Sequence, residues 1–101
     1  MDNPLAVIAE PQRQRILQIV WNNEKSAGEI AADFDITFGA VSQHLRVLRT
    51  AGYVSMTKRG RHHFYRANRK ALGPLAQHLE AMWRTSLFQL KQLAEAEEQS
   101  E

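Results

Sequence analysis

Residues 26–52 read SAGEIAADFDITFGAVSQHLRVLRTAG, which is two helical patterns separated by a short break. Ser26 and Glu29 stand three positions apart, the spacing of a capping box in which each side chain accepts a hydrogen bond from the other residue's backbone amide. This signature predicts a helix that starts there and buries Ile30 and Phe34 before it ends. The first helix of the pair is therefore short.

The break and the second helix complete a helix-turn-helix. Asp35 occupies the reversal, where we expect a left-handed backbone conformation that few residues other than glycine adopt. Thr37 is a good N-cap for a helix over residues 37–51, and Gly52 is suited to end it. Two short helices joined by a tight turn form this motif, here residues 26–52.

The second helix has a core face and an outer face. At about 100° per residue, Val41, Leu45 and Leu48 fall together and face the core. The opposite side carries small residues, hydroxyls, an amide and a guanidinium, and no carboxylate. Its members are Gly39, Ser42, Gln43, Arg46 and Thr50. Such a set suits base edges in a major groove, with glutamine pairing adenine and arginine pairing guanine or a phosphate; the alternative is a solvated helix face.

Apolar helices are expected at both ends of the chain. Asn3 followed by Pro4 predicts the start of a helix over residues 4–10. Apolar residues recur at helical spacing over residues 72–97 and predict a long C-terminal helix, broken or restarted near Gly73. A monomer this small cannot cover that apolar stripe alone, so pairing with a second copy is the economical arrangement.

Residues 53–67 favour an extended chain. Aromatic and β-branched residues on both sides of Arg59-Gly60-Arg61 predict a hairpin whose tip glycine adopts a positive φ. The chain is therefore expected to be one domain, residues 1–101, of mainly α (α+β) class. Its predicted architecture is a winged helix-turn-helix with a two-stranded β-hairpin wing and a long C-terminal dimerisation helix.

Charge is segregated along the chain. Residues 37–70 hold eight Lys/Arg and no Asp or Glu, whereas residues 1–36 hold three bases and six acids, and residues 71–101 hold two bases and five acids. The formal charges of the three segments are therefore +8, −3 and −3. A segment cleared of acids attracts a polyanion, so nucleic acid is the leading partner.

Four motifs resemble the ArsR-type winged-helix repressors, and the resemblance covers nearly the whole chain. The motifs are Glu10–Leu17, Gly28–Ala31, Ala40–Val54, and Gly60-Arg61 ahead of Phe64-Tyr65-Arg66. The resemblance implies a homodimer whose first and last helices form the subunit interface. It also implies that residues 37–46 enter the major groove of double-stranded DNA and that the wing touches the backbone or the minor groove.

Two sets of site residues follow from the helical wheel, the charge and the resemblance. The expected DNA-binding residues are Thr37, Phe38, Gly39, Ser42, Gln43, His44, Arg46, Arg49, Lys58, Arg59, Arg61 and His62. The expected dimer-interface residues are Leu5, Ile8, Leu75, Leu79, Met82, Trp83, Leu87 and Leu90.

The sequence departs from the family pattern at two positions. Phe38 follows the helix cap, where the family has a polar residue; its ring either lies partly buried against the preceding helix or contacts a thymine methyl group. Asp35 stands at the turn position that is usually glycine, and we expect it to keep the geometry at some strain.

The histidines do not predict a metal site, and no cofactor is expected. The absence of cysteine excludes thiolate ligands. His78 and Glu80 diverge on the last helix and cannot close a ligand shell. His62 and His63 point to opposite faces of a strand, His62 as an exposed wing residue and His63 as part of the hairpin packing. His44 is expected to be structural or to touch phosphate.

The sequence thus predicts a homodimeric, sequence-specific transcriptional repressor that reads a palindromic operator. The last helix resembles the branch of the family without metal ligands, which acts as an autorepressor relieved by a partner protein or an unidentified ligand. The open alternatives are a repressor that responds to a metal or small ligand at an inter-subunit site, and a winged-helix module that binds protein.

Other classes of protein are not indicated. There is no pairing of carboxylates near a histidine and no glycine-rich phosphate loop, so catalysis is not predicted. Neither a signal peptide nor an apolar run long enough to span a membrane is apparent, so a cytoplasmic location is expected.

Overall fold

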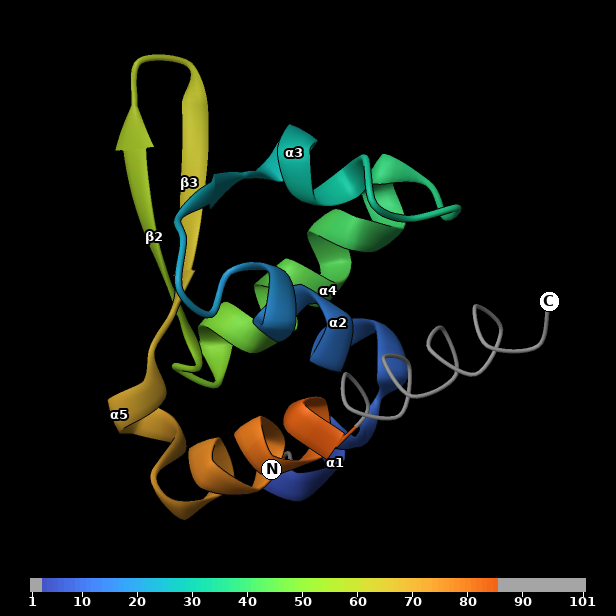
Figure 1. The fold of residues 1–101 in the computed structure, drawn as a ribbon. Helices are drawn as coiled ribbons and strands as arrows, with labels where there is room; N and C mark the ends of the chain where they lie inside the picture. Colours follow the sequence, from blue (N-terminus) through green and yellow to red (C-terminus); the bar gives the residue numbers. More distant parts are fainter. Residues whose placement is uncertain (1–2, 86–101) are drawn as a thin grey trace, which may run out of the picture. The chain divides into compact units, whose positions relative to one another are not determined.

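The computed structural model describes residues 3–85 of the 101-residue chain. The chain divides into two compact units, Met1–Ala71 and Leu72–Glu101, which we describe separately. In chain order the elements are α1 (Pro4–Ala9), α2 (Pro11–Ile19), β1 (Lys25–Ser26), α3 (Ala27–Ala31), α4 (Phe38–Thr50), β2 (Val54–Arg59), β3 (His62–Ala67) and α5 (Arg69–Leu72), and all of them except β1 are labelled in Figure 1.

Side-chain caps set the start of each N-terminal helix. The Asn3 Oδ1 accepts a hydrogen bond from the Leu5 amide at 2.9 Å, with proline at the first position of α1. The Glu10 carboxylate accepts from the Arg13 amide at 2.9 Å and caps α2. These caps satisfy amides that have no partner within the helix, and the cap at Asn3 is the one that the sequence predicted.

The predicted capping box at the start of α3 is confirmed. The Ser26 amide donates to Glu29 Oε1 at 2.9 Å, and the Glu29 amide donates to Ser26 Oγ at 3.1 Å. The hydrogen bond from the Ser26 backbone holds the pKa of the Glu29 carboxyl below its ordinary value. Of the two residues expected to be buried by this helix, Ile30 is buried and Phe34 is only half-buried.

The expectation of a left-handed, strained Asp35 is wrong. Within the described residues, positive φ angles occur only at glycines, and Asp35 has none. The chain instead reverses with a negative φ at Asp35, after turns in which the Asp33 and Phe34 amides donate to the Ile30 and Ala31 carbonyls. A run of such turns does not need a residue in the left-handed region.

Helix α4 begins and ends as the sequence predicts. Thr37 Oγ1 accepts from the Ala40 amide at 3.1 Å. At the other end, Gly52 has a φ of 85°, and its amide donates to the Arg49 carbonyl while the Tyr53 amide donates to the Leu48 carbonyl. This pair of hydrogen bonds is a Schellman motif, and both Tyr53 and Leu48 are buried beneath it.

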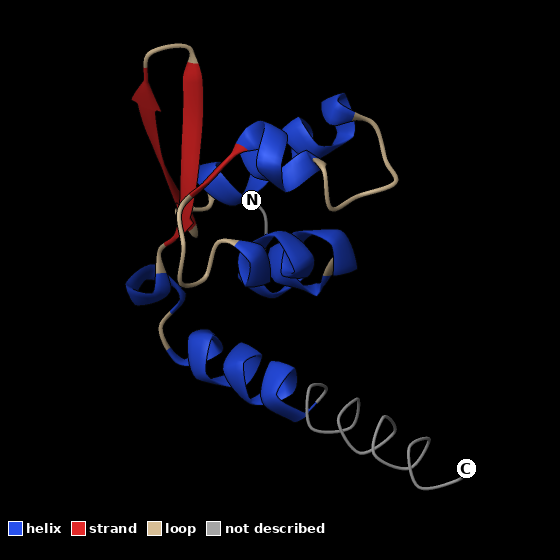
Figure 2. Ribbon diagram, turned by 45° about the horizontal axis from the view of Figure 1, so that its top comes forward, coloured by secondary structure: helices blue, strands red, loops and turns tan. Residues whose placement is uncertain are grey.

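The predicted hairpin is confirmed, but it belongs to a sheet of three strands. The strand order is β1-β3-β2, all antiparallel neighbours, and Gly60 turns between β2 and β3 with a φ of 62°. The unexpected strand β1 pairs Lys25 with Tyr65 and Ser26 with Phe64. Figure 2 shows β1 beside the hairpin and leading directly into α3, so the wing and the helix-turn-helix share a backbone connection.

The core of the first unit is apolar, and its residues come from helices α1 to α4, from strand β2 and from the segments next to them. Its buried residues are Val7, Ile8, Ile16, Leu17, Val20, Trp21, Ile30, Val41, Leu45, Leu48, Tyr53 and Val54. The hairpin extends away from these helices as an arm (Figure 1). The core therefore fixes α4 and the base of the wing, while the tip projects.

The second unit begins with the predicted break. Gly73 has a φ of 57°, and helical backbone follows over residues 74–85. Leu72, Ala76 and Leu79 are buried. The remainder of the helix predicted over residues 72–97 lies outside the described residues. No helix in residues 3–85 is long and apolar enough to cross a membrane.

Candidate nucleic-acid interface

Helix α4 presents the two faces that the helical wheel predicts. Val41, Leu45 and Leu48 are at most 1% exposed. The five outer residues are all exposed, and four of them line a shallow hollow of about 290 Å³: Gly39, Ser42, Gln43 and Arg46. The face holds three hydrogen-bonding side chains (Ser42, Gln43 and Thr50) and the Arg46 guanidinium, which can read base edges and bind phosphate.

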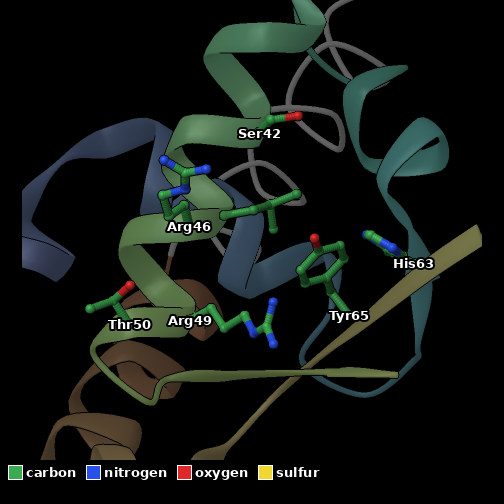
Figure 3. Close-up of a pocket in the computed structure, with 7 residues that line it drawn as sticks. Ser42, Arg46, Arg49, Thr50, His63 and Tyr65 are labelled. Atoms are coloured by element: carbon green, nitrogen blue, oxygen red, sulfur yellow. The ribbon is translucent and has the colours of Figure 1, made fainter. Parts of the chain in front are cut away.

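A larger groove, of about 430 Å³, separates α4 from strand β3 (Figure 3). Its lining residues are Ser42, Leu45, Arg46, Arg49, Thr50, His63 and Tyr65. In Figure 3, Arg49 extends from α4 toward the strand, while Tyr65 and His63 extend from the opposite wall. A groove with two guanidiniums and no acid among its lining residues is suited to a phosphate backbone.

The sequence interpretation missed the strand side of this groove. His63 was expected to pack within the hairpin, but it is exposed and lines the groove with Tyr65. The two residues stand two apart, and the two-residue period of a strand places both on one face. The two-residue period of the predicted strand could therefore have placed His63 and Tyr65 on the same face from the sequence alone.

The wing tip carries one paired and one unpaired arginine. The Arg59 guanidinium forms a salt bridge with the Glu24 carboxylate and lies 4.2 Å from the centroid of the Phe64 ring. Arg61 is exposed and takes part in no ion pair within the described part of the chain. His62, also exposed, meets the edge of the Phe64 ring with 6.2 Å between centroids.

His44 lies on the inner side of α4. Its Nε2 and the Gln12 Oε1 are 2.9 Å apart, and its Nδ1 lies 3.7 Å from the Glu10 carboxylate. Its side chain is 19% exposed. The structure therefore directs His44 toward α2, apart from the outer residues with which the sequence grouped it.

Phe38 is exposed, and its surroundings are compatible with either of its two alternatives, a ring that lies partly against the preceding helix or one that contacts DNA. Its side chain is 57% exposed. It lines a third hollow, of about 310 Å³, together with Ser26, Ala27, Gly28, Arg61, His62 and His63. The neighbouring Thr37 side chain is occupied as the helix cap. The first turn of α4 and the wing tip thus share one surface.

The remaining bases of residues 37–70 leave a positive surface. Among the described residues, Arg59 forms an ion pair with Glu24, and His44 lies beside the carboxylate of Glu10. Arg46, Arg49 and Lys58 are exposed and outside both pairs. Within residues 3–85 neither ion pair offsets their charge, which is suited to binding phosphate.

The expected dimer-interface residues divide by exposure. Leu5 is 58% exposed and Met82 is 38% exposed, and Leu75 and Trp83 are half-buried. Ile8 and Leu79 are buried within the single chain. Leu87 and Leu90 lie outside the described residues.

The histidines and acids of residues 3–85 do not gather. No group of three His, Cys, Asp or Glu residues in that part of the chain could hold a metal ion.

A helix-turn-helix with an exposed, acid-free second helix, flanked by a basic wing, defines a winged-helix DNA-binding protein. The sequence profile described as bacterial regulatory protein, arsR family, matches residues 10–56. The chain belongs to the ArsR family of bacterial transcriptional regulators and is not an enzyme.

Two characterised relatives extend the match beyond the profile. The chain is 32% identical over 72 residues to the transcriptional repressor SdpR of Bacillus subtilis, covering 71% of this chain and 80% of that protein. It is 30% identical over 96 residues to the HTH-type transcriptional regulator Rv2034 of Mycobacterium tuberculosis, covering 95% of this chain and 90% of the relative.

Solved structures share the fold. One is a possible transcriptional regulator for arsenical resistance, with a TM-score of 0.71, 37% identity, and coverage of 82% of this chain and 86% of the other. Another is HlyU from Vibrio cholerae, with a TM-score of 0.71, 30% identity, and coverage of 80% and 85%.

Proposed function

We propose that the protein is a homodimeric, sequence-specific repressor that reads a palindromic operator with α4 in the major groove. The observation that carries this proposal is the outer face of α4, where Ser42, Gln43 and Arg46 are exposed on a helix without a carboxylate. In helix-turn-helix proteins the second helix enters the major groove and its N-terminal residues contact base edges. Gln43 is the residue best suited to pair with adenine.

The groove between α4 and β3 supports a second contact, with the DNA backbone. Arg49 approaches it from the helix, and His63 and Tyr65 approach it from the strand. A phosphate held there fixes the register of the duplex, so that the outer residues of α4 meet a defined set of bases. The wing tip, with Arg61 and Lys58, then meets the backbone or the minor groove.

A dimer supports recognition of a palindrome. We propose that the helices over residues 4–10 and 72–97 form the subunit interface, with Leu5 and Met82 as the exposed apolar residues that a partner would cover. Two copies of α4 related by a twofold axis would read half-sites about one helical turn, or about 34 Å, apart.

The sign of regulation is proposed as repression, by blocking access of the polymerase to a promoter. The relative SdpR is named as a repressor, whereas the relative HlyU is named as an activator. The sequence of the last helix resembles the autorepressor branch of the family and so favours repression over activation. No thiolate metal sensing is proposed, because the chain has no cysteine.

The proposal is tested by selecting bound fragments from genomic DNA and then measuring Gln43→Ala on the selected duplex and on random DNA. The variant should lose about 1–3 kcal/mol of binding free energy on the selected duplex, with a much smaller loss on random DNA. Gln18→Ala removes a glutamine from α2, outside the proposed DNA-contacting and dimer-interface sets, and is the control. Equal losses on both duplexes would contradict base reading by Gln43.

The same selection separates DNA binding from a protein-binding module. A repressor binds duplexes in a salt-dependent manner because phosphate contacts release counterions. If the wild-type protein retains no fragment even at low ionic strength, the DNA-binding proposal fails.

A further inference from the structure

Phe38 is a large apolar side chain left on the surface that is proposed to face DNA. It is the first residue of α4, directly after the cap, and is 57% exposed. It stands three residues before Val41, which is only 1% exposed, so it continues the line of the buried stripe. The apolar stripe of α4 is therefore buried at Val41 but exposed at Phe38.

The hollow that Phe38 lines is bordered by α3 on one side and by the wing on the other. Ala27 and Gly28 line the hollow of about 310 Å³ on the side of α3, and a Cβ added at Gly28 would meet nothing within 4 Å. Arg61 and His62 line it from the wing. The ring therefore borders open space that is apolar on one side and basic on the other.

No unengaged carboxylate belongs to the elements that line this hollow. Strands β1 and β3 and helix α4 contain no acid, and the single acid of α3, Glu29, is hydrogen-bonded to the Ser26 amide within the capping box. A ligand for this place carries an apolar group close to negative charge. The thymine C5-methyl is the apolar group that the major groove displays, and phosphates flank it.

We propose that Phe38 is a specificity-determining residue whose ring contacts the C5-methyl group of a thymine in each half-site. This inference rests on the proposed function, since it assumes that α4 enters the major groove. It adds an apolar element to a reading face that otherwise works by hydrogen bonds. The expected preference is for thymine over uracil at one position of each half-site.

The size of the effect follows from the area of one methyl group. Covering one such group changes affinity by about fourfold, and both half-sites of a palindrome together give about fifteenfold. A loss of this size is measurable by titration and is smaller than the loss of a bidentate hydrogen-bonded pair.

The test replaces each thymine of the selected duplex by deoxyuridine, one symmetric pair at a time, and measures binding to the wild-type protein, Phe38→Ala and Gln43→Ala. One pair should weaken wild-type binding by about fifteenfold. Phe38→Ala should bind the thymine duplex as weakly as wild type binds the uracil duplex, with no further loss on uracil. Gln43→Ala should keep the full sensitivity to uracil.

Several outcomes would overturn the assignment. They are uracil substitution that costs nothing at any position, an equal cost of uracil in wild type and Phe38→Ala, and a loss in Phe38→Ala that is as large on random DNA. The last result would fit a ring that docks on a partner protein or a second copy. Circular dichroism checks that Phe38→Ala is folded, and Phe38→Leu, which keeps an apolar side chain, should retain part of the preference for thymine.

Failure of the proposed function looks different from failure of this inference. If Gln43→Ala loses much more affinity on selected than on random DNA while the uracil scan is flat, only the role of Phe38 is wrong. If wild type shows no preference for any duplex, both are wrong.

Discussion

Arg59 belongs to the basic segment that the sequence identifies, but its charge is partly offset within the folded chain. Its guanidinium is engaged by Glu24 and by the Phe64 ring, although its side chain remains 56% exposed. Exposed salt bridges contribute about 0–1 kcal/mol, so a phosphate can compete with Glu24 for this arginine. The pair therefore lowers the contribution of Arg59 to DNA binding without removing it.

Replacing Glu24 should strengthen DNA binding. In Glu24→Gln the charge of Arg59 is no longer offset, so affinity for selected and random duplexes should rise together by up to about fivefold at low salt. The measurement is the dissociation constant as a function of salt concentration. Asp33→Asn removes an equal charge from an exposed site outside both ion pairs. Equal gains in the two variants would show that only net charge matters.

Arg61 should behave as a phosphate contact. Because it is exposed and takes part in neither ion pair of residues 3–85, Arg61→Ala should weaken binding to all sequences. The slope of log affinity against log salt should fall by about one. An unchanged slope would place Arg61 away from the duplex.

His44 and Arg46 should separate packing from DNA contact on one helix. His44→Ala removes a half-buried hydrogen bond to Gln12 and should lower the free energy of unfolding by about 1 kcal/mol, with the salt slope unchanged. Arg46→Ala should do the reverse, lowering the slope and leaving stability nearly intact. Urea denaturation and salt titrations of both variants check this. A reduced slope in His44→Ala would return His44 to the DNA-contacting set.

Among the helices and strands, local signals located most boundaries. Caps at Asn3, Ser26 and Thr37 and the glycines at positions 52 and 60 act over a few residues, so the sequence alone reveals them. Strand β1 escaped prediction because two residues carry no alternation; its existence depends on pairing with β3, about 40 residues later.

The errors at Asp35 and Arg59 have different origins. The strained turn at Asp35 came from the family pattern, whereas the actual backbone solves the reversal differently. The Glu24–Arg59 pair joins residues 35 positions apart, and no spacing rule reveals it. By contrast, the outer face of α4 depends only on helical period and was predicted fully.

The capping box should make stability depend on pH. The folded-state pKa of Glu29 is lowered, so the unfolded chain binds more protons in that range, and stability falls as pH falls from 4.5 through the lowered folded pKa. In Glu29→Gln the side chain can still accept the Ser26 hydrogen bond but does not titrate. Urea midpoints measured through this window should vary less with pH in Glu29→Gln than in wild type. Identical pH profiles would contradict the role of the charged cap.

For the assembled protein, the test concerns subunit pairing. Leu5 is an exposed apolar residue on α1, and Leu5→Glu should place a charge in the proposed interface. The variant should remain folded but have the mass of a single subunit in solution, and its operator affinity should fall steeply. Asn22→Asp adds the same charge at an exposed position between α2 and β1 and should leave the dimer intact. A wild-type mass of one subunit at micromolar concentration would contradict the proposed dimer.

The pairing of β1 with β3 has a consequence for how such a protein can change its target. The angle between wing and reading helix is held by main-chain hydrogen bonds and by buried apolar residues, whereas the side chains that face outward from α4 make none of these contacts. Those outward positions can therefore be exchanged with little effect on how the protein seats on a duplex. A single substitution at one of these positions can therefore change the preferred operator while the wing and α4 keep their positions on the duplex.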